Sequence, residues 1–360
     1  MTTEHDDQRY VEHLQRQLLR EGTEEFIREQ ASYLDSKREE VAEIFKNLAA
    51  STNKLPSKWQ AGVLAFERTS HLDCFYSTSI FNPLLEKALA ICKKAEIEPT
   101  NPIHFYNSPG LEPTAAALPS NDTHMLFAGQ GTFSFCNYWS KIFSEALFEA
   151  AATTLELQKW DPVIFLEQIK KTSIIEKATK LAIWYSLHDT LVGYGKLEQE
   201  ERFTSLRSLL LNSMEIFVVG HEIAHFCYYE AYPDTNGLAP DQSDKDLEIN
   251  CDNIGLAVCT VYGIGENNTF ATNFIGPLVF LYSIHLCEKV KEIITKKPRH
   301  DSNSHPSIND RIKNVFKFAK VAKVHPDILE IMKDSLDAAI VIGSQVQLIA
   351  TEVASKNTDV

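Results

Sequence analysis

The sequence lacks the local signatures of several enzyme and membrane classes. It contains no GxSxG elbow and no GxxxxGK[ST] loop, so neither a serine hydrolase of that type nor a P-loop enzyme is supported. The first thirty residues carry no basic segment followed by an apolar one, so no export signal is visible and a cytoplasmic location is expected. The longest nearly uncharged apolar run, 274–287, is too short to cross a bilayer. We predict a buried core helix there and no integral membrane segment.

Regular cysteine spacing is also missing. The seven cysteines are an odd number with no CxxC pair, which is typical of reduced thiols that pack as small apolar side chains. Positive charge is scarce relative to negative charge, because 35 Lys and Arg face 49 Asp and Glu. The resulting net charge of -14 disfavours binding to phosphate backbones and anionic lipid surfaces. We therefore expect no nucleic-acid partner, while no pattern in the sequence specifies the oligomeric state.

The sequence does contain 44% hydrophobic residues and long stretches with helical spacing. We predict a mainly α protein of the α+β class with a small β-sheet. Residues 1–100 are expected to form a helical N-terminal region, 101–350 a catalytic domain and 351–360 a frayed tail. The turn-rich segment 107–123 is expected to be a long loop. The run "HMLFA", 124–128, is predicted to be a strand that leads into a helix.

The strongest chemical signal is "HEIAH", residues 221–225. Side chains four apart lie on one face of an α-helix, so His221 and His225 can direct ring nitrogens at one metal ion. Glu222 lies about 100° round the helix from His221, where a carboxylate can accept a proton from water without ligating the metal. Gly220 lets another element approach closely. The pattern also arises by chance, so a third ligand is needed to support a metal site.

Six acidic residues downstream are candidates for the third ligand: Glu230, Asp234, Asp241, Asp244, Asp246 and Glu248. The segment 232–246 contains two prolines and a glycine, so its acids are typical of solvated turns and caps. Glu248 instead opens a helical pattern, with Asp252 and Gly255 on the same face. Two carboxylates beside apolar residues require a positive partner. We predict Glu248 as the third ligand and Asp252 as acceptor of a ligand histidine's other ring N–H; for Glu248 alone, an acidic first turn favoured by the helix dipole is the alternative.

Two histidines and one carboxylate leave one coordination position open, as in catalytic zinc sites. Zn²⁺ is therefore the expected cofactor. Two nearby cysteines are less suitable as ligands. Cys227 lies about 200° from His225 on the same helix and points away, and Cys251 lies about 300° from Glu248, where Asp252 fits the ligand face better.

Three elements in this order, "HEIAH", Glu248-x-x-x-Asp252 and "SHPSINDRI" at 304–312, resemble the gluzincin metallopeptidases of the M48 type. The resemblance covers roughly residues 205–320 and implies a zincin-like helical metallopeptidase core. It implies that Glu248 is the third zinc ligand and that Asp252 orients a ligand histidine. The membrane helices of many such members are missing here, and the first 200 residues match nothing in them.

The same resemblance places His305 and Arg311 beside the zinc. His305 would hydrogen-bond the tetrahedral intermediate, and Arg311 would pair with Asp252 or with substrate. Taken alone, their segment is better explained as a helix that begins with proline and carries a surface arginine. The aromatic segment "FCNYWSK", 135–141, more faintly resembles the Lit-type phage-exclusion peptidases; otherwise it is expected to pack and form an interface.

Together these features predict a zinc metalloendopeptidase that cleaves peptide bonds of an intracellular protein. Zinc would activate a water, Glu222 would act as general base, and His305 with Arg311 behind it would stabilise the oxyanion. A polypeptide substrate would add as a strand to 124–128, provided that this strand lies at an edge of the sheet and is not an ordinary buried one. Two other functions stay open: a catalytically silent zincin-fold sensor or scaffold whose zinc only stabilises the helices, and a zinc hydrolase of a non-protein substrate.

Overall fold

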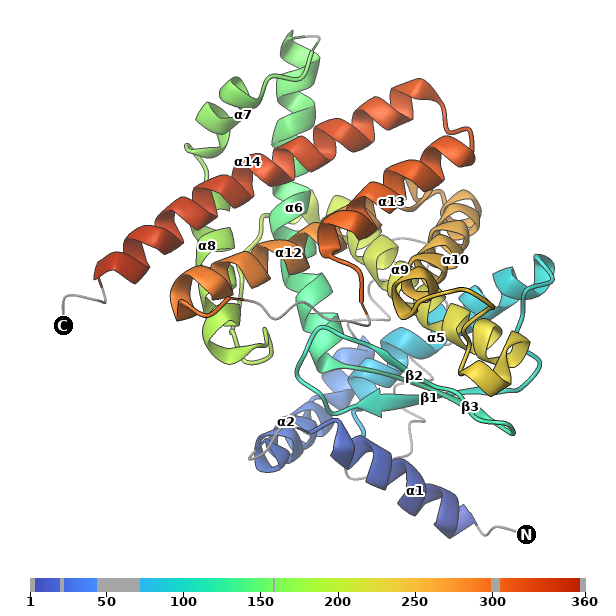
Figure 1. Ribbon diagram of the computed structural model, residues 1–360. Coiled ribbons are helices and arrows are strands. Elements are labelled where there is room, and N and C mark those ends of the chain that lie inside the picture. The colour runs from blue at the N-terminus through green and yellow to red at the C-terminus, as the bar shows by residue number, and fades with distance from the viewer. Residues whose placement is uncertain (1–3, 20–22, 44–71, 158, 299–304, 357–360) are drawn as a thin grey trace.

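The prediction of a mainly α protein with a small sheet is confirmed by the computed structural model (Figure 1). The structure describes residues 4–19, 23–43, 72–157, 159–298 and 305–356. The helices and short 3-10 turns are α1 (Glu4–Gln17), α2 (Glu24–Ser36), α5 (Phe75–Lys94), α6 (Gln130–Leu157), α7 (Pro162–Ile169), α8 (Ile174–His188), η1 (Glu201–Phe203), α9 (Thr204–Ala231), η2 (Pro233–Thr235), α10 (Asp244–Glu266), α11 (Thr269–Thr272), α12 (Ile275–Thr295), α13 (Ile308–Val321) and α14 (Pro326–Lys356).

The three strands are β1 (Ile103–Ser108), β2 (Ala116–Leu118) and β3 (His124–Gly129), in the spatial order β1-β3-β2. β3 pairs in parallel with β1 and antiparallel with β2, where Ala117 faces Leu126. The expectation that 124–128 is an edge strand is therefore wrong, because β3 is central and all six of its residues are buried. The expected loop at 107–123 is also partly wrong, since it contains β2. This strand is only three residues long and its alanines give no alternation of apolar and polar side chains.

One continuous apolar core joins the helices from α5 to α14. The helix α9 lies at its centre and packs against α10, α12, α6 and α5, while α14 crosses α8 and α12 (Figure 1). The predicted core helix at 274–287 is confirmed as most of α12. The aromatic segment 135–141 lies in α6, where Phe135, Cys136 and Trp139 are fully buried packing residues.

Local capping explains where α10, which carries Glu248, begins. The Ser243 side chain accepts a hydrogen bond from the Asp246 backbone N–H, and the Asp246 carboxylate accepts one from the Ser243 backbone N–H. This reciprocal pair satisfies two donors that a helix N-terminus otherwise leaves unpaired. Asp246, one of the six candidate acids, is thus used as a cap.

The two ends of the chain differ from expectation in detail. The described part of 1–100 is mostly helical, but residues 44–71 lie outside the described part of the chain, and α5 belongs to the common core. The frayed tail expected from 351 is wrong up to Lys356, because α14 continues through that residue on good helix formers. Residues 357–360 lie outside the described part.

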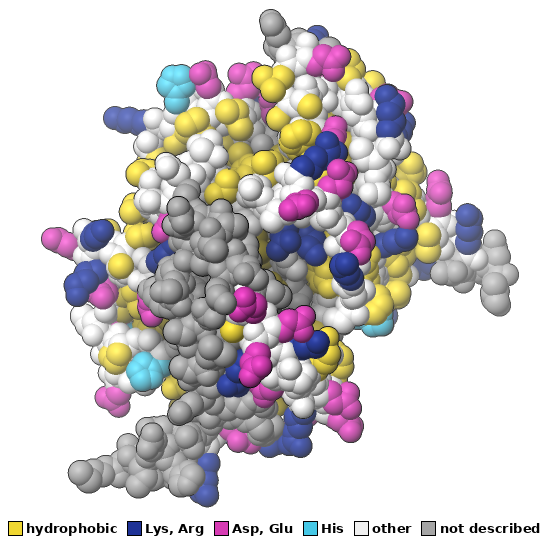
Figure 2. Space-filling model, turned by 180° about the vertical axis from the view of Figure 1, so that it is seen from behind, with side chains coloured by type: hydrophobic (Ala, Val, Ile, Leu, Met, Phe, Trp, Pro, Cys, Tyr) yellow, Lys and Arg dark blue, Asp and Glu magenta, His cyan; other side chains and the backbone are white. Residues whose placement is uncertain are grey.

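Among the described residues, one helix is long and apolar enough to cross a membrane by length and composition. It is α14, whose most apolar window has a mean hydropathy of 1.3 and is 33% buried. Core helices of soluble proteins meet the same criterion, so this helix carries no assignment. On the face behind the view of Figure 1, acidic, basic and hydrophobic side chains are mixed, and the negative net charge forms no single patch there (Figure 2).

Candidate metal centre

The site is built where α9 and α10 pack closely. On α9, His221 and His225 lie one turn apart and face α10, and their ring nitrogens Nε2 are 3.2 Å from each other. On α10, the Glu248 carboxylate reaches both rings, with Oε2 3.4 Å from His221 Nε2 and Oε1 3.5 Å from His225 Nε2. One ligand atom from each of the three residues lies within 4.8 Å of the other two, so this group could hold a metal ion.

Asp252 fixes the ring of His221 from behind. Its Oδ1 lies 3.0 Å from His221 Nδ1, so the ring N–H points at the carboxylate and Nε2 keeps a lone pair toward the cluster. Arg311, on α13, holds the other side of Asp252 with two hydrogen bonds, Nε to Oδ2 at 2.8 Å and Nη2 to Oδ1 at 2.6 Å. Of the two partners considered for Arg311, Asp252 is the one that it contacts. The chain Arg311–Asp252–His221 therefore orients one ligand.

The donor set fits a zinc ion. Because Nδ1 of His221 is bonded to Asp252, its Nε2 atom is the one that faces Nε2 of His225. A cation between these two atoms would accept an electron pair from each, and the Glu248 carboxylate would supply a third pair. Two imidazoles and one carboxylate suit Zn²⁺ and leave a position open. The two cysteines near the motif take no part, because Cys227 Sγ contacts the Ile97 carbonyl oxygen at 3.0 Å and Cys251 is buried outside the group.

The electrostatics agree with a cation-binding centre. Burial opposes protonation of His221, but hydrogen bonds to Asp252 and Glu248 outweigh it and raise the pKa of this imidazole to about 10. Burial, then the neighbouring charge of His221, lowers the pKa of His225 to about 4. Burial acts against ionisation of Glu248 as well, yet the hydrogen bond to His221 brings the pKa of this carboxyl to about 2. Glu248 is therefore held ionised, and its carboxylate favours a positive charge at this point, carried either by a second proton on His221 or by a bound cation.

Glu222 lies beside the three candidate ligands but is not one of them. Its side chain is buried, and burial raises the pKa of its carboxyl to about 7. The backbone N–H of Ala117, on β2, acts weakly against this shift, and Ala117 lines the same cavity as Glu222. The alanines of β2 therefore lie at the cavity wall near Glu222.

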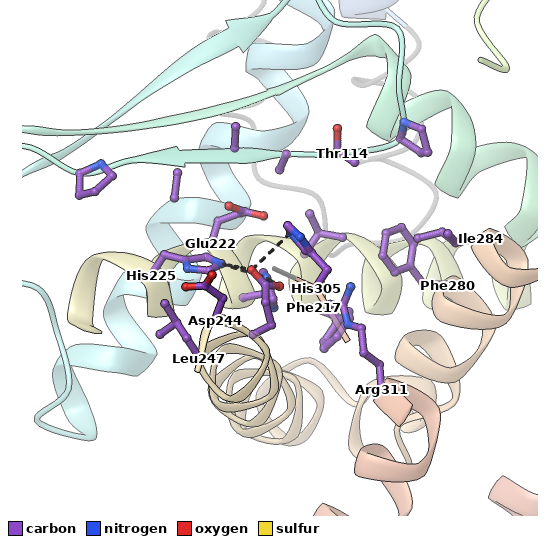
Figure 3. Close-up of a pocket in the computed structure, with 18 of the residues that line it drawn as sticks. Thr114, Phe217, Glu222, His225, Asp244, Leu247, Phe280, Ile284, His305 and Arg311 are labelled. Atoms are coloured by element: carbon purple, nitrogen blue, oxygen red, sulfur yellow. Dashed lines mark hydrogen bonds and ion pairs between the residues drawn. The ribbon is translucent and has the colours of Figure 1, made fainter. Parts of the chain in front are cut away.

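A cavity of about 500 Å³ contains these groups, within the range of small-molecule and peptide sites. Its opposite walls are the segment 113–119, which includes β2, and the helices α9, α10 and α12 (Figure 3). His305 projects into the cavity, with Nε2 3.5 Å from Glu248 Oε1, while its side chain is 56% exposed. His305 thus lies at the rim.

Other candidate acids lie elsewhere. Glu230 accepts hydrogen bonds from the backbone N–H groups of Thr100 and Asn101, from the Thr100 hydroxyl and from His124 Nε2. It fixes the end of α9 to the sheet and ligates nothing. Asp244 lines the cavity but is exposed. Sequence reasoning missed the cavity wall at 113–119 and the contribution of α12; two prolines that flank three alanines were the only signal for the wall.

No family model, no curated protein and no solved structure was found that matches this chain.

Proposed function

We propose that this protein is a zinc-dependent metallopeptidase with a zincin-like core of the gluzincin type. The observation that carries the proposal is the convergence of His221, His225 and Glu248 in one cavity, next to the buried Glu222. A purely structural site is usually closed by four protein ligands and has no use for a free carboxylate beside it. When bound, a zinc ion would supply Lewis-acid polarisation of the scissile carbonyl and a more acidic water.

Glu222 is placed to move the proton. It would accept a proton from the attacking water and return it to the nitrogen of the leaving amine. His305, at the rim of the cavity, would donate a hydrogen bond to the carbonyl oxygen as negative charge develops there. Arg311 would act through Asp252 as a positioning residue, because both of its contacting nitrogens are engaged by that carboxylate.

An extended polypeptide would bind along β2. Among the described residues, β2 pairs with β3 alone, and its alanines line the cavity that contains Glu222. Addition of a strand to an unpaired edge binds the peptide backbone irrespective of sequence. The substrate strand thus belongs on β2, whereas the sequence had pointed to 124–128.

Metal content and proteolysis test this proposal on the same samples. Zinc per chain is measured by mass spectrometry, and cleavage of an unfolded protein is followed in parallel. We expect about one zinc per wild-type chain, loss of zinc in Glu248→Ala, and full zinc with activity lowered by roughly 10²–10⁴-fold in Glu222→Gln. Asp234→Asn, which changes an exposed acid outside the cavity, is the matched control and should keep both.

Each contrary result has a distinct meaning. No zinc in the wild type, or zinc unaffected by Glu248→Ala, would refute the ligand set. Zinc bound as expected, with no cleavage of any unfolded protein, would refute the peptidase and leave the scaffold or the hydrolase of another substrate.

A further inference from the structure

The end of the cavity beside His225 is lined by polar groups that the proposed mechanism does not use. Asp244 and Leu247 line this end from α10, next to the His225 ring (Figure 3). Tyr229 lies one turn after His225 on the same face of α9 and also lines the cavity. Asn236 lines it from the turn that joins α9 to α10.

The turn that carries Asn236 is packed directly on α9. A Cβ atom on Gly237 would lie 3.3 Å from the Tyr229 backbone nitrogen and 3.4 Å from the Tyr228 carbonyl carbon. Asn236 and Gly237 both have a positive φ, of 54° and 91°, which Asn and Gly adopt at lower cost than other residues. This close packing holds Asn236 and Tyr229 at the same end of the cavity.

The Tyr229 ring is held in a fixed position. Its hydroxyl donates a hydrogen bond to Asn121 Oδ1 at 3.2 Å, and its ring meets the His124 ring edge-on, with centroids 6.1 Å apart. The side chain is half-buried. A fixed aromatic ring at the wall of a cavity can receive a guanidinium or ammonium group on its face.

Asp244 carries the charge that the metal centre leaves unbalanced. Two hydrogen bonds to Asp252 neutralise Arg311. Glu248, together with Glu222 when it is ionised, would balance the two charges of a bound zinc ion. The exposed carboxylate of Asp244 has no hydrogen bond and no ion pair within the described part of the chain. A positively charged group that enters this end would therefore meet one free negative charge.

The start of α10 does not depend on Asp244, because Ser243 and Asp246 already form the capping pair there. The carboxylate is thus available to a ligand. The net charge of -14 acts in the same direction, since a negative protein attracts positively charged segments over long distances.

The geometry points to a subsite, formed by Asp244, Tyr229 and Asn236, that binds an Arg or Lys side chain of the polypeptide substrate close to the cleaved bond. This inference rests on the proposed peptidase function. Arg suits the subsite better than Lys, because its planar guanidinium can stack on the ring while it donates two hydrogen bonds to the carboxylate. The substrate class is an extended segment with a basic residue at a fixed distance from the cleaved bond.

Peptide binding and cleavage test the subsite separately. Zinc-loaded Glu222→Gln is titrated with fluorescent peptides that differ only by Arg, its neutral isostere citrulline, or Glu at one position. We expect the Arg peptide to bind roughly three- to five-fold more tightly than the citrulline peptide, and the Glu peptide to bind most weakly. The preference should shrink in 1 M salt, where the screening length is about 3 Å. Cleavage by the wild type, mapped by mass spectrometry, should fall at a constant distance from Arg.

Charge changes at Asp244 sharpen the test. In the Glu222→Gln background, Asp244→Asn should bring the Arg-to-citrulline ratio close to one, and Asp244→Lys should reverse the order so that the Glu peptide binds most tightly. Asp234→Lys makes the same charge change at an exposed acid outside the cavity and should keep the order of the three peptides. Zinc content and thermal unfolding show that each variant is folded.

Two changes at Tyr229 test the aromatic wall. Tyr229→Leu removes the ring and should weaken binding of the Arg peptide by roughly two- to five-fold, with little effect on the citrulline peptide. Tyr229→Phe keeps the ring and removes only the hydroxyl, so it should bind the Arg peptide nearly as the unchanged protein does.

The outcomes separate the subsite from the proposed function. Equal binding of Arg and citrulline peptides, or an order that Asp244→Lys leaves unchanged, would overturn the subsite. Cleavage at positions unrelated to Arg would also overturn it while the peptidase stands. Tighter binding of the Arg peptide that depends on Asp244, with no cleavage by the wild type, would support the subsite and refute the peptidase.

Discussion

Gly220 on α9 and Gly255 on α10 meet where the two helices cross. A Cβ atom on Gly220 would lie 3.1 Å from the Gly255 Cα, and one on Gly255 would lie 3.1 Å from a backbone carbonyl oxygen of α9. His221 directly follows the first glycine, and Asp252 and Glu248 lie one and two turns before the second. The close contact therefore sets the distance across which His221 reaches both carboxylates.

Gly255→Ala should force the two helices apart. We expect the free energy of unfolding to fall by about 1–3 kcal/mol, because the new Cβ would meet backbone atoms of α9 that cannot move aside as a side chain could. Zinc binding should also become weaker. Urea unfolding and zinc titration measure the two effects. Gly265→Ala is the matched control on the same helix, where a Cβ meets nothing within 4 Å, and should stabilise by up to about 1 kcal/mol. Equal stability of the two variants would show that the helix contact is not tight.

The buried pair of Asp252 and Arg311 gives a second prediction. Asp252 is fully buried, so Asp252→Asn leaves the guanidinium uncompensated and replaces one of the two accepting oxygens, shared between Arg311 and His221, by an NH2 donor. We expect a loss of roughly 3–5 kcal/mol in the free energy of unfolding and a roughly 10–100-fold loss of zinc affinity. Combining it with Arg311→Met should cost less than the sum of the two single changes. Additive costs in urea unfolding would contradict a direct coupling.

A third prediction concerns the pH dependence of stability and rests on Glu215, away from the metal centre on α9. Glu215 is 1% exposed and its Oε1 has no hydrogen-bond partner among the described residues. Burial raises the pKa of this carboxyl to about 8, although the charge of Arg207 acts against the shift. In the unfolded chain the pKa is about 4.3. Between these values the native state binds more protons, so its stability falls as pH rises from about 4.3 to about 8.

Glu215→Gln should remove that fall. At pH 8 we expect the variant to be more stable than wild type by an amount on the order of a few kcal/mol, with little difference near pH 4. The measurement is urea unfolding of both proteins at pH 4, 6 and 8. If the difference between the two proteins stays constant across this range, Glu215 is not the group that titrates.

Glu230 provides a fourth prediction, which separates structural acids from ligands. Its carboxylate accepts hydrogen bonds from two backbone N–H groups and from His124, a fully buried ring stacked on Phe226 at 4.6 Å. Glu230→Ala would leave the buried His124 ring without its partner, while the exposed Thr100 N–H could bond to water, so the change should cost about 1–3 kcal/mol. The melting temperature should fall, while the zinc content per chain stays at the wild-type value. Zinc loss at temperatures where the variant is folded would place Glu230 in the metal centre after all.

Sequence reasoning reached the local features because each has a short-range physical cause. A buried apolar helix at 274–287 and a helical pattern that contains Glu248 follow from composition and periodicity. It failed at the sheet, where the central or edge position of a strand depends on partners distant in the chain. The sequence left open whether β3 is an edge strand or a buried one, and β2, with the sequence AAL, has almost no local preference for a strand.

The sequence by itself determined which side chains share a helix face. The helical period places His221 beside His225 and Glu248 beside Asp252 whatever the rest of the chain does. Only the tertiary structure decided that α9 and α10 cross at two glycines, that Arg311 holds Asp252, and that β2 lines the cavity that contains Glu222. These arrangements join residues far apart in the chain, and they arise from the way the helices and the sheet bury their apolar faces together, which no local pattern records.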